Sequence, residues 1–184
     1  MPYQLTANPT KLHLGCGVRR MEGYAGIDRV KTNATDYVFD LEQPNWPFED
    51  SSIDEVVMIH FLEHIHDHMG FFRELYRVMK NDGEVKIRGP HALSSGAWQD
   101  PTHTKPLHEE FFLYFDNYWR LSQGINYADY GCDFVTIGKG YILNEDYQKW
   151  KDSGELTEEQ LAFDMKHKFN VAQELMVVLR ARKQ

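Results

Sequence analysis

The chain has only two cysteines, no cluster of basic residues and no long apolar run among its 184 residues. The cysteines, Cys16 and Cys132, are too few for a disulfide framework. No apolar stretch approaches the roughly 20 residues that a membrane-spanning helix needs, and the first residues lack the charged-then-apolar pattern of a secretion signal. We therefore expect a cytoplasmic protein with reduced cysteines and no membrane span.

Positive charge is also scarce, because the formal net charge is -8. Proteins that follow a phosphate backbone carry a basic patch or stripe, so nucleic acid is an unlikely partner. The 42% of hydrophobic and 26% of charged residues are ordinary for a globular protein. The length suits one domain with a substantial core, and we interpret residues 1–184 as that single domain.

Two glycines interrupt the chain where the first apolar run stops. This run ends at Gly15-Cys16-Gly17, and a second short run ends at Asp28. Glycine permits a sharp turn and lets a ligand approach the backbone closely. A carboxylate at the end of the next strand can accept hydrogen bonds from a ribose diol. The pattern predicts a nucleoside-containing cofactor at the end of a parallel sheet.

The third glycine of a dinucleotide-binding motif is missing, and the acid comes too early for that motif. Residues 18–24 are too few for a crossover helix, because such a connection needs about a dozen residues. The anion site at a helix N-terminus is therefore weakened. S-adenosylmethionine, which has no pyrophosphate, tolerates this loss, whereas a dinucleotide oxidoreductase is disfavoured.

Alternating patterns predict both strands and helices along the chain. The polar, irregular residues 92–105 are too long for a simple connection and predict a functional loop. Strands are expected at residues 11–14, 24–27, 37–39, 55–59, 84–87, 134–143 and 172–182. Helices are expected from the N-cap Asp67 to a stop at Asn81-Asp82-Gly83, over 108–121, and over 157–168 with Thr157 and Gln160 as a capping box.

A series of segments in this order resembles the class I S-adenosylmethionine-dependent methyltransferases, in a small form with a shortened first crossover. The segments are residues 12–17, 26–28, 39–41, 46–65 and 74–90. The resemblance implies an α/β fold with a Rossmann-like, doubly wound, mostly parallel sheet, an antiparallel edge strand and three α/β/α layers. It implies a cofactor-binding half at 11–90 and a substrate and lid region at 91–184, with 134–143 and 172–182 as antiparallel strands.

The same resemblance implies which residues contact S-adenosylmethionine. Asp28 would bind the ribose diol, while Asp40 would accept the adenine amine and Leu41 would pack on the adenine ring. His60 would lie near the sulfonium. The loop against the methionine part would be formed by Gly15, Cys16 and Gly17.

His13 departs from the pattern, because many relatives carry an acid at this position that helps to orient the cofactor's ammonium group. A neutral histidine can accept a hydrogen bond on only one ring nitrogen. Either another group holds the ammonium, or the affinity for the cofactor is reduced.

Candidate bases lie at the fourth strand and after the fifth. A hydroxyl acceptor requires a base with a pKa near the working pH, which suits histidine, whereas an amine acceptor needs none. His60, His91, His103 and Asp100 are the candidates, the last two in the loop 99–108 that follows a strand whose carboxyl end should face the cofactor. The alternative is that this loop only caps the site.

A metal site is not expected, although His60, His64 and His68 follow one another at intervals of four residues. Two histidines at this spacing on a helix can share a metal ion, but His60 falls at the end of a predicted strand. No cysteine pair or H-E-x-x-H motif supports the cluster. Glu63-His64 resembles the family's pair at the start of a helix, which we interpret as structural.

The sequence thus predicts a methyltransferase that acts on a small molecule or a sugar by direct in-line transfer. The acidic charge disfavours a polyanion, and the aromatic residues of the second half predict a core or lid more than a recognition surface. Two alternatives stay open. The chain could be a methyltransferase-fold protein that acts through a protein partner without catalysis, or a metal-dependent hydrolase built on the histidines.

Overall fold

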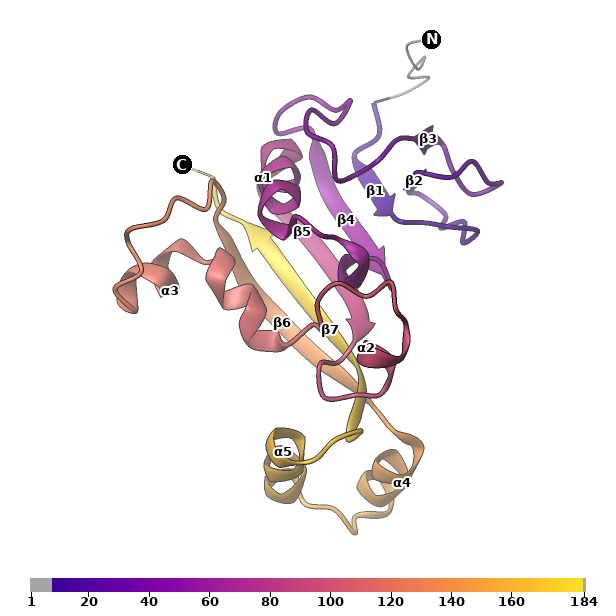
Figure 1. Ribbon diagram of the computed structural model, residues 1–184, viewed down its shortest axis with the longest axis vertical. Coiled ribbons are helices and arrows are strands. Elements are labelled where there is room, and N and C mark those ends of the chain that lie inside the picture. The colour runs from indigo at the N-terminus through magenta and orange to yellow at the C-terminus, as the bar shows by residue number, and fades with distance from the viewer. Residues whose placement is uncertain (1–7, 184) are drawn as a thin grey trace.

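The computed structural model describes residues 8–183, which form one seven-stranded sheet with the order β3-β2-β1-β4-β5-β7-β6. The first five of these strands are parallel, and β7 runs antiparallel to both of its neighbours (Figure 1). The strands are β1 (Lys11–Leu14), β2 (Ala25–Asp28), β3 (Tyr37–Val38), β4 (Ile53–Ile59), β5 (Met79–Pro90), β6 (Phe134–Leu143) and β7 (Ala172–Ala181). The predicted fold class and its antiparallel edge are confirmed.

Short helices connect the later strands. In Figure 1, α1 lies against β4 and β5, while α4 and α5 lie beyond the ends of β6 and β7. No helix in residues 8–183 is long and apolar enough to cross a membrane. The helices are η1 (Leu62–His64), α1 (His68–Val78), α2 (Gly96–Gln99), η2 (Glu109–Phe115), α3 (Asn117–Ser122), α4 (Glu145–Ser153) and α5 (Glu158–His167).

The connection between β1 and β2 is a loop, as its length predicted. This loop contains no helix and is held by polar contacts. Arg20 donates to both oxygens of Asp36 at 2.8 and 2.9 Å, and the Gly26 amide donates to the same carboxylate at 2.8 Å. The loop between Gly17 and Gly26 is therefore held by Asp36.

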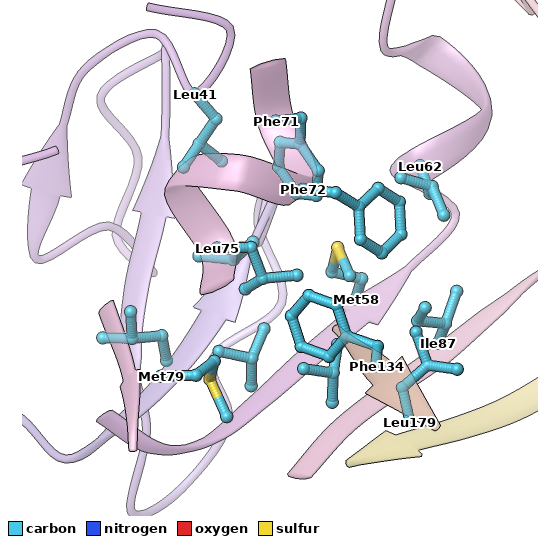
Figure 2. Packing of buried hydrophobic residues seen from close by; sticks show 14 of the residues in the cluster. Leu41, Met58, Leu62, Phe71, Phe72, Leu75, Met79, Ile87, Phe134 and Leu179 are labelled. Atoms are coloured by element: carbon cyan, nitrogen blue, oxygen red, sulfur yellow. The ribbon is translucent and has the colours of Figure 1, made fainter. Parts of the chain in front are cut away.

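The core lies between α1 and the sheet (Figure 2). Phe71, Phe72 and Leu75 are spaced along one face of α1 and are buried, as the helical periodicity predicts. Phe72 stacks on Phe115 with ring centroids 3.8 Å apart, and its edge meets Phe134. Burying a side chain of this size contributes about 2–3 kcal/mol to the free energy of unfolding.

Two predicted helices have other bounds in the structure. The helix from Asp67 ends at Val78, because the fully buried Met79 already pairs with Ile53 in the sheet, and Asp82 rather than Gly83 adopts a positive φ. The predicted helix 108–121 is divided at Asp116, whose side chain accepts a hydrogen bond from the backbone of α3. The sequence analysis also missed α2 and α4.

One face of the sheet is open to solvent where β5 and β7 pair. Val85 and Ile87 point into the core, so the alternating Lys86 and Arg88 point to the opposite face. Their side chains are 46% and 43% exposed and pair with acidic side chains of β4 and β7. Over these strands, this face of the sheet is exposed to solvent where the resemblance implied a further layer of helices.

Candidate functional site

A pocket of about 590 Å³ lies at the carboxyl ends of β1, β2 and β4. This volume falls within the range of small-molecule sites, about 300–1,000 Å³. Its position is the one at which open α/β sheets bind ligands. Five residues that the sequence predicted for the cofactor line it, namely Gly15, Asp28, Asp40, Leu41 and His60.

Asp28 fixes the loops on both sides of this pocket. One oxygen of its carboxylate accepts a hydrogen bond from the Gly17 amide at 2.9 Å, and the other accepts one from the Val30 amide at 3.0 Å. A carboxylate offers about four acceptor positions, so both oxygens retain capacity for a ligand. The turn beside this contact needs glycine, because Gly15 and Gly17 have φ values of +62° and +51°.

Phe61 forms the wall beside Gly15 and was not predicted as a site residue. A Cβ atom at Gly15 would lie 2.2 Å from Cδ2 of the Phe61 ring, far inside van der Waals contact. The glycine is therefore required both by its left-handed backbone and by this ring. The position of Phe61 directly after His60 was the signal that could have identified it.

Leu41 and Asp40 are held at the pocket by their own neighbours. Leu41 is buried, and its carbonyl oxygen accepts a hydrogen bond from the Trp46 indole at 3.1 Å. Asp40 accepts one from the Glu42 amide at 3.0 Å, which closes a turn after β3. The pair thus presents an apolar and an acidic side chain at one end of the pocket.

The other three residues predicted for the cofactor lie behind this pocket, not on its lining. Cys16 is buried, and this burial, with the nearby charge of Asp28, raises the pKa of its thiol. Gly17 contributes its amide to Asp28. His13 lies inside β1, and burial lowers its pKa, so the ring is neutral at pH 7 with Nδ1 unpartnered among residues 8–183.

His60 ends β4 with a φ of +52°, a strained conformation for a residue with a side chain. Its ring lies between two carboxylates. Nδ1 is 3.5 Å from Glu63 Oε1, and Nε2 is 3.4 Å from Glu174 Oε1. Contact with Glu63 raises the pKa of His60, Glu174 adds to the effect, and partial burial and Arg88 oppose it.

A second pocket of about 330 Å³ adjoins the first. His60 and His64 line both pockets, so the two share a wall. Two of the predicted bases, Asp100 and His103, line the second pocket, and its other polar residues are Glu63, Gln99, Gln173 and Glu174. The loop after β5 therefore contributes directly to a site next to the first pocket.

His91, the remaining candidate base, lines neither pocket. It is almost fully buried, its Nδ1 accepts a hydrogen bond from the Leu93 amide, and its Nε2 lies 3.4 Å from Glu109 Oε2. The Tyr141 hydroxyl donates to the other Glu109 oxygen at 2.9 Å. This histidine lowers the pKa of Glu109 to about 2, against the opposing effect of burial.

Stability should depend on pH through Glu109. A carboxyl whose pKa is lowered in the folded state stabilises the protein above its unfolded pKa, near 4.5, and this contribution is lost as the pH falls toward about 2. Glu109→Gln should lower the free energy of unfolding at pH 7 by about 1–3 kcal/mol. Urea titrations from pH 7 to pH 3 measure the difference, which should shrink below pH 5. A difference that is constant with pH would contradict this assignment.

The aromatic residues of the second half divide between core and surface. Phe112 and Phe115 are buried, as the core interpretation predicted. Trp98 and Tyr118 are 64% and 65% exposed, and the Trp98 indole donates to the Ala92 carbonyl oxygen. No aromatic residue of this half lines either of the two pockets described here.

Comparison with known proteins agrees with this geometry. Residues 22–87, which contain β2 to β4 and α1, match the family model of the methyltransferase domain. No curated protein gives a significant sequence match. Solved structures share the fold at low sequence identity, however.

Three such structures illustrate the likeness. The YcgJ protein from Bacillus subtilis is 14% identical, with a TM-score of 0.54 over 99% of this chain and 95% of that one. A SAM-dependent methyltransferase from Archaeoglobus fulgidus is 16% identical, with a TM-score of 0.54 over 92% and 85%. A Haloferax volcanii methyltransferase, in complex with the Trm112 methyltransferase activator, is 17% identical, with a TM-score of 0.53 over 99% and 86%.

Residues 22–87 thus match a methyltransferase domain, and the chain shares the fold of S-adenosylmethionine-dependent methyltransferases. Both findings agree with the predicted resemblance, and S-adenosylmethionine is the cofactor that this resemblance implies.

Proposed function

We propose that the protein methylates a small polar molecule or a sugar bound in the second pocket. The observation that carries this proposal is that the second pocket adjoins the first, since His60 and His64 line both. The amide and carboxylate side chains around the second pocket suit an acceptor with several hydroxyl groups. The net charge of -8 disfavours a polyanionic acceptor.

The first pocket fits S-adenosylmethionine in size and in chemistry. Asp28 would hold the ribose hydroxyls, Asp40 and Leu41 would contact the adenine, and Gly15 would leave room for the methionine part. Bound S-adenosylmethionine supplies an electrophilic methyl group. The contribution of the protein is then mainly to align the acceptor, which can supply about 7–11 kcal/mol of the barrier.

His13 is buried within β1 and does not line the first pocket, so it is not in a position to meet the ammonium end of the cofactor. This placement supports the first of the two possibilities raised by the sequence, in which a group other than His13 holds the ammonium.

A hydroxyl acceptor would lose its proton to a side chain on the shared wall or in the second pocket. His60 holds the best position, because it lines both pockets and two carboxylates orient its ring. His103 and Asp100 line the acceptor side. We assign no such role to His91, because it is buried outside both pockets with its Nε2 facing the Glu109 carboxylate.

A methyl-transfer assay with labelled S-adenosylmethionine tests the proposal. Hydroxylated small molecules and sugars should accept the label, and His60→Asn should lower turnover at least about 100-fold if it is the base. His167→Asn, at an exposed histidine outside both pockets, is the matched control and should retain full turnover. Faster transfer to bulk RNA than to every small acceptor would overturn the acceptor class, and cofactor binding without any turnover would favour a role through a protein partner.

A further inference from the structure

We propose that Glu63, His64 and His103 bind a divalent transition-metal ion at the edge of the second pocket. One donor atom from each of these side chains lies within 4.8 Å of the other two. The donors come from η1 and from the loop after β5, and all three residues line the second pocket.

Glu63 is the strongest evidence for a ligand. Its side chain is 1% exposed, and neither carboxylate oxygen has a hydrogen-bond partner among residues 8–183. The nearest described cationic group is the His60 ring, whose Nδ1 at 3.5 Å is beyond a good hydrogen bond. A buried carboxylate is costly unless it is paired or coordinates a metal, so an ion would supply the missing partner.

Both histidines are oriented to offer a lone pair. His103 Nδ1 lies 3.1 Å from the Ala97 carbonyl oxygen, and His64 Nδ1 lies 3.3 Å from the Thr102 carbonyl oxygen. The Thr102 hydroxyl is nearer to His64 Nδ1, at 3.0 Å, but its own proton is donated to Asp100 at 2.7 Å, so it too accepts from His64. Because a carbonyl only accepts, each Nδ1 must carry the proton, which leaves each Nε2 with its lone pair. This arrangement, one nitrogen bonded to a carbonyl and the other free, is typical of histidines that bind metals.

A similar cluster elsewhere provides the contrast. His91, His108 and Glu109 also lie within 4.8 Å of one another, but each histidine accepts a backbone amide proton at Nδ1. Their Nε2 atoms must therefore carry protons and face the Glu109 carboxylate. In that cluster the histidines and the acid contact one another, whereas Glu63 has no hydrogen-bond partner among residues 8–183 and contacts only the His60 ring at 3.5 Å, and His64 and His103 each keep a free lone pair.

Two nitrogen donors and one carboxylate suit zinc, cobalt, iron or manganese better than magnesium or calcium. Ligands about 2.1 Å from a tetrahedral ion lie about 3.4 Å from one another, so modest rotation of the side chains would close the site. Asp100 lies at the edge of this site, with its Oδ2 3.9 Å from His103 Nε2. The remaining position would face the second pocket.

No metal site was expected from the sequence, because His60 falls at the end of a strand and no cysteine pair or H-E-x-x-H motif supports the spacing of four residues from His60 to His68. The proposed ligands instead come from two segments that are separated by α1 and β5. Nothing in the local pattern relates His103 to Glu63, and their proximity follows only from the neighbouring positions of β4 and β5 in the sheet.

Metal binding can be measured without any acceptor or turnover. The protein is stripped with a chelator, then titrated with Zn²⁺ by calorimetry and with Co²⁺ by visible absorption. We expect one ion per chain, with affinity at least about tenfold lower in Glu63→Gln and in His103→Asn. Two control variants should bind the ion as the wild type does. His108→Asn lies in the cluster of His91, His108 and Glu109, and His167→Asn lies at an exposed position.

Thermal unfolding distinguishes a variant that has lost the metal site from one that has failed to fold. Zn²⁺ should raise the unfolding temperature of the wild type and of His108→Asn, because an ion that binds only the folded state stabilises it. At the same Zn²⁺ concentration it should raise the unfolding temperature of Glu63→Gln and His103→Asn less than that of the wild type. Equal Zn²⁺ affinity in the wild type and in both ligand variants, or no bound ion in the wild type, would overturn the proposal.

One consequence for catalysis rests on the proposed function. An acceptor hydroxyl bound to the ion would lose its proton more readily, and chelation would then slow methyl transfer. The titrations above do not depend on this step. Failure of metal binding would leave the acceptor assignment standing, and failure of the methylation assay would leave the metal site standing.

Discussion

Replacing Asp28 by alanine is expected to lower the affinity for S-adenosylmethionine at least about 100-fold, equivalent to about 2.7 kcal/mol. The variant loses the carboxylate that we propose binds the ribose hydroxyls, and it also releases the amides of Gly17 and Val30 beside the pocket. Both effects act on the same ligand, so the loss exceeds that of one hydrogen bond. Calorimetric titration with S-adenosylmethionine and S-adenosylhomocysteine measures it directly.

Asp36→Ala is the matched control for this experiment. Asp36 also holds the loop between β1 and β2, through Arg20 and the Gly26 amide, but it does not line the pocket. Its loss should lower the free energy of unfolding by about 1–3 kcal/mol while changing the cofactor affinity much less. If Asp28→Ala bound the cofactor within threefold of the wild type, the assignment of this carboxylate to the ribose would be wrong.

Gly15→Ala is expected to have the second largest effect, on both stability and cofactor binding. Its left-handed φ of +62° alone costs a residue with a side chain about 1–2 kcal/mol. The added methyl group would also overlap the Phe61 ring, which must move into or away from the pocket. We expect a total loss of about 3 kcal/mol in the free energy of unfolding and a cofactor affinity at least about tenfold lower.

Gly17→Ala separates the two causes. Gly17 has a similar φ of +51°, but an added Cβ would meet no atom within 4 Å. This variant should show only the backbone cost. Adding Phe61→Ala should recover part of the stability of Gly15→Ala but none of that of Gly17→Ala. Equal unfolding free energies for the two glycine variants, measured in urea, would show that the Phe61 ring moves aside freely.

The cofactor half was predictable because its signals are local. The turn at Gly15 and Gly17, the acid at Asp28 and the apolar strand before His60 each lie within a few residues of the element they define. Parallel strands then bring their carboxyl ends together, so separate motifs converge on one pocket. The loop between β1 and β2 was likewise predictable, since its length excludes a helix.

The second pocket and the residues around it were less predictable, because their contacts join segments that are distant in the sequence. His91 belongs to Glu109 and not to a pocket, and only the pairing of their side chains shows this. Phe61 is important because its ring fills the space beside Gly15, which has no side chain. Glu63 is important because its buried carboxylate has no hydrogen-bond partner among residues 8–183. The break at Asp116 could not be predicted from helical periodicity. The apolar residues of η2 and α3 together have the spacing expected of one longer helix.

The open face of the sheet is poorly suited to stacking against a second sheet. Lys86, Arg88 and Arg180 pair there with acidic side chains of β4, β5 and β7. Each exposed pair adds little to stability, about 0–1 kcal/mol. Stacking two such faces would remove water from all of these charges at once, which is costly. The same ion pairs that contribute little to the folded chain therefore oppose association through this face.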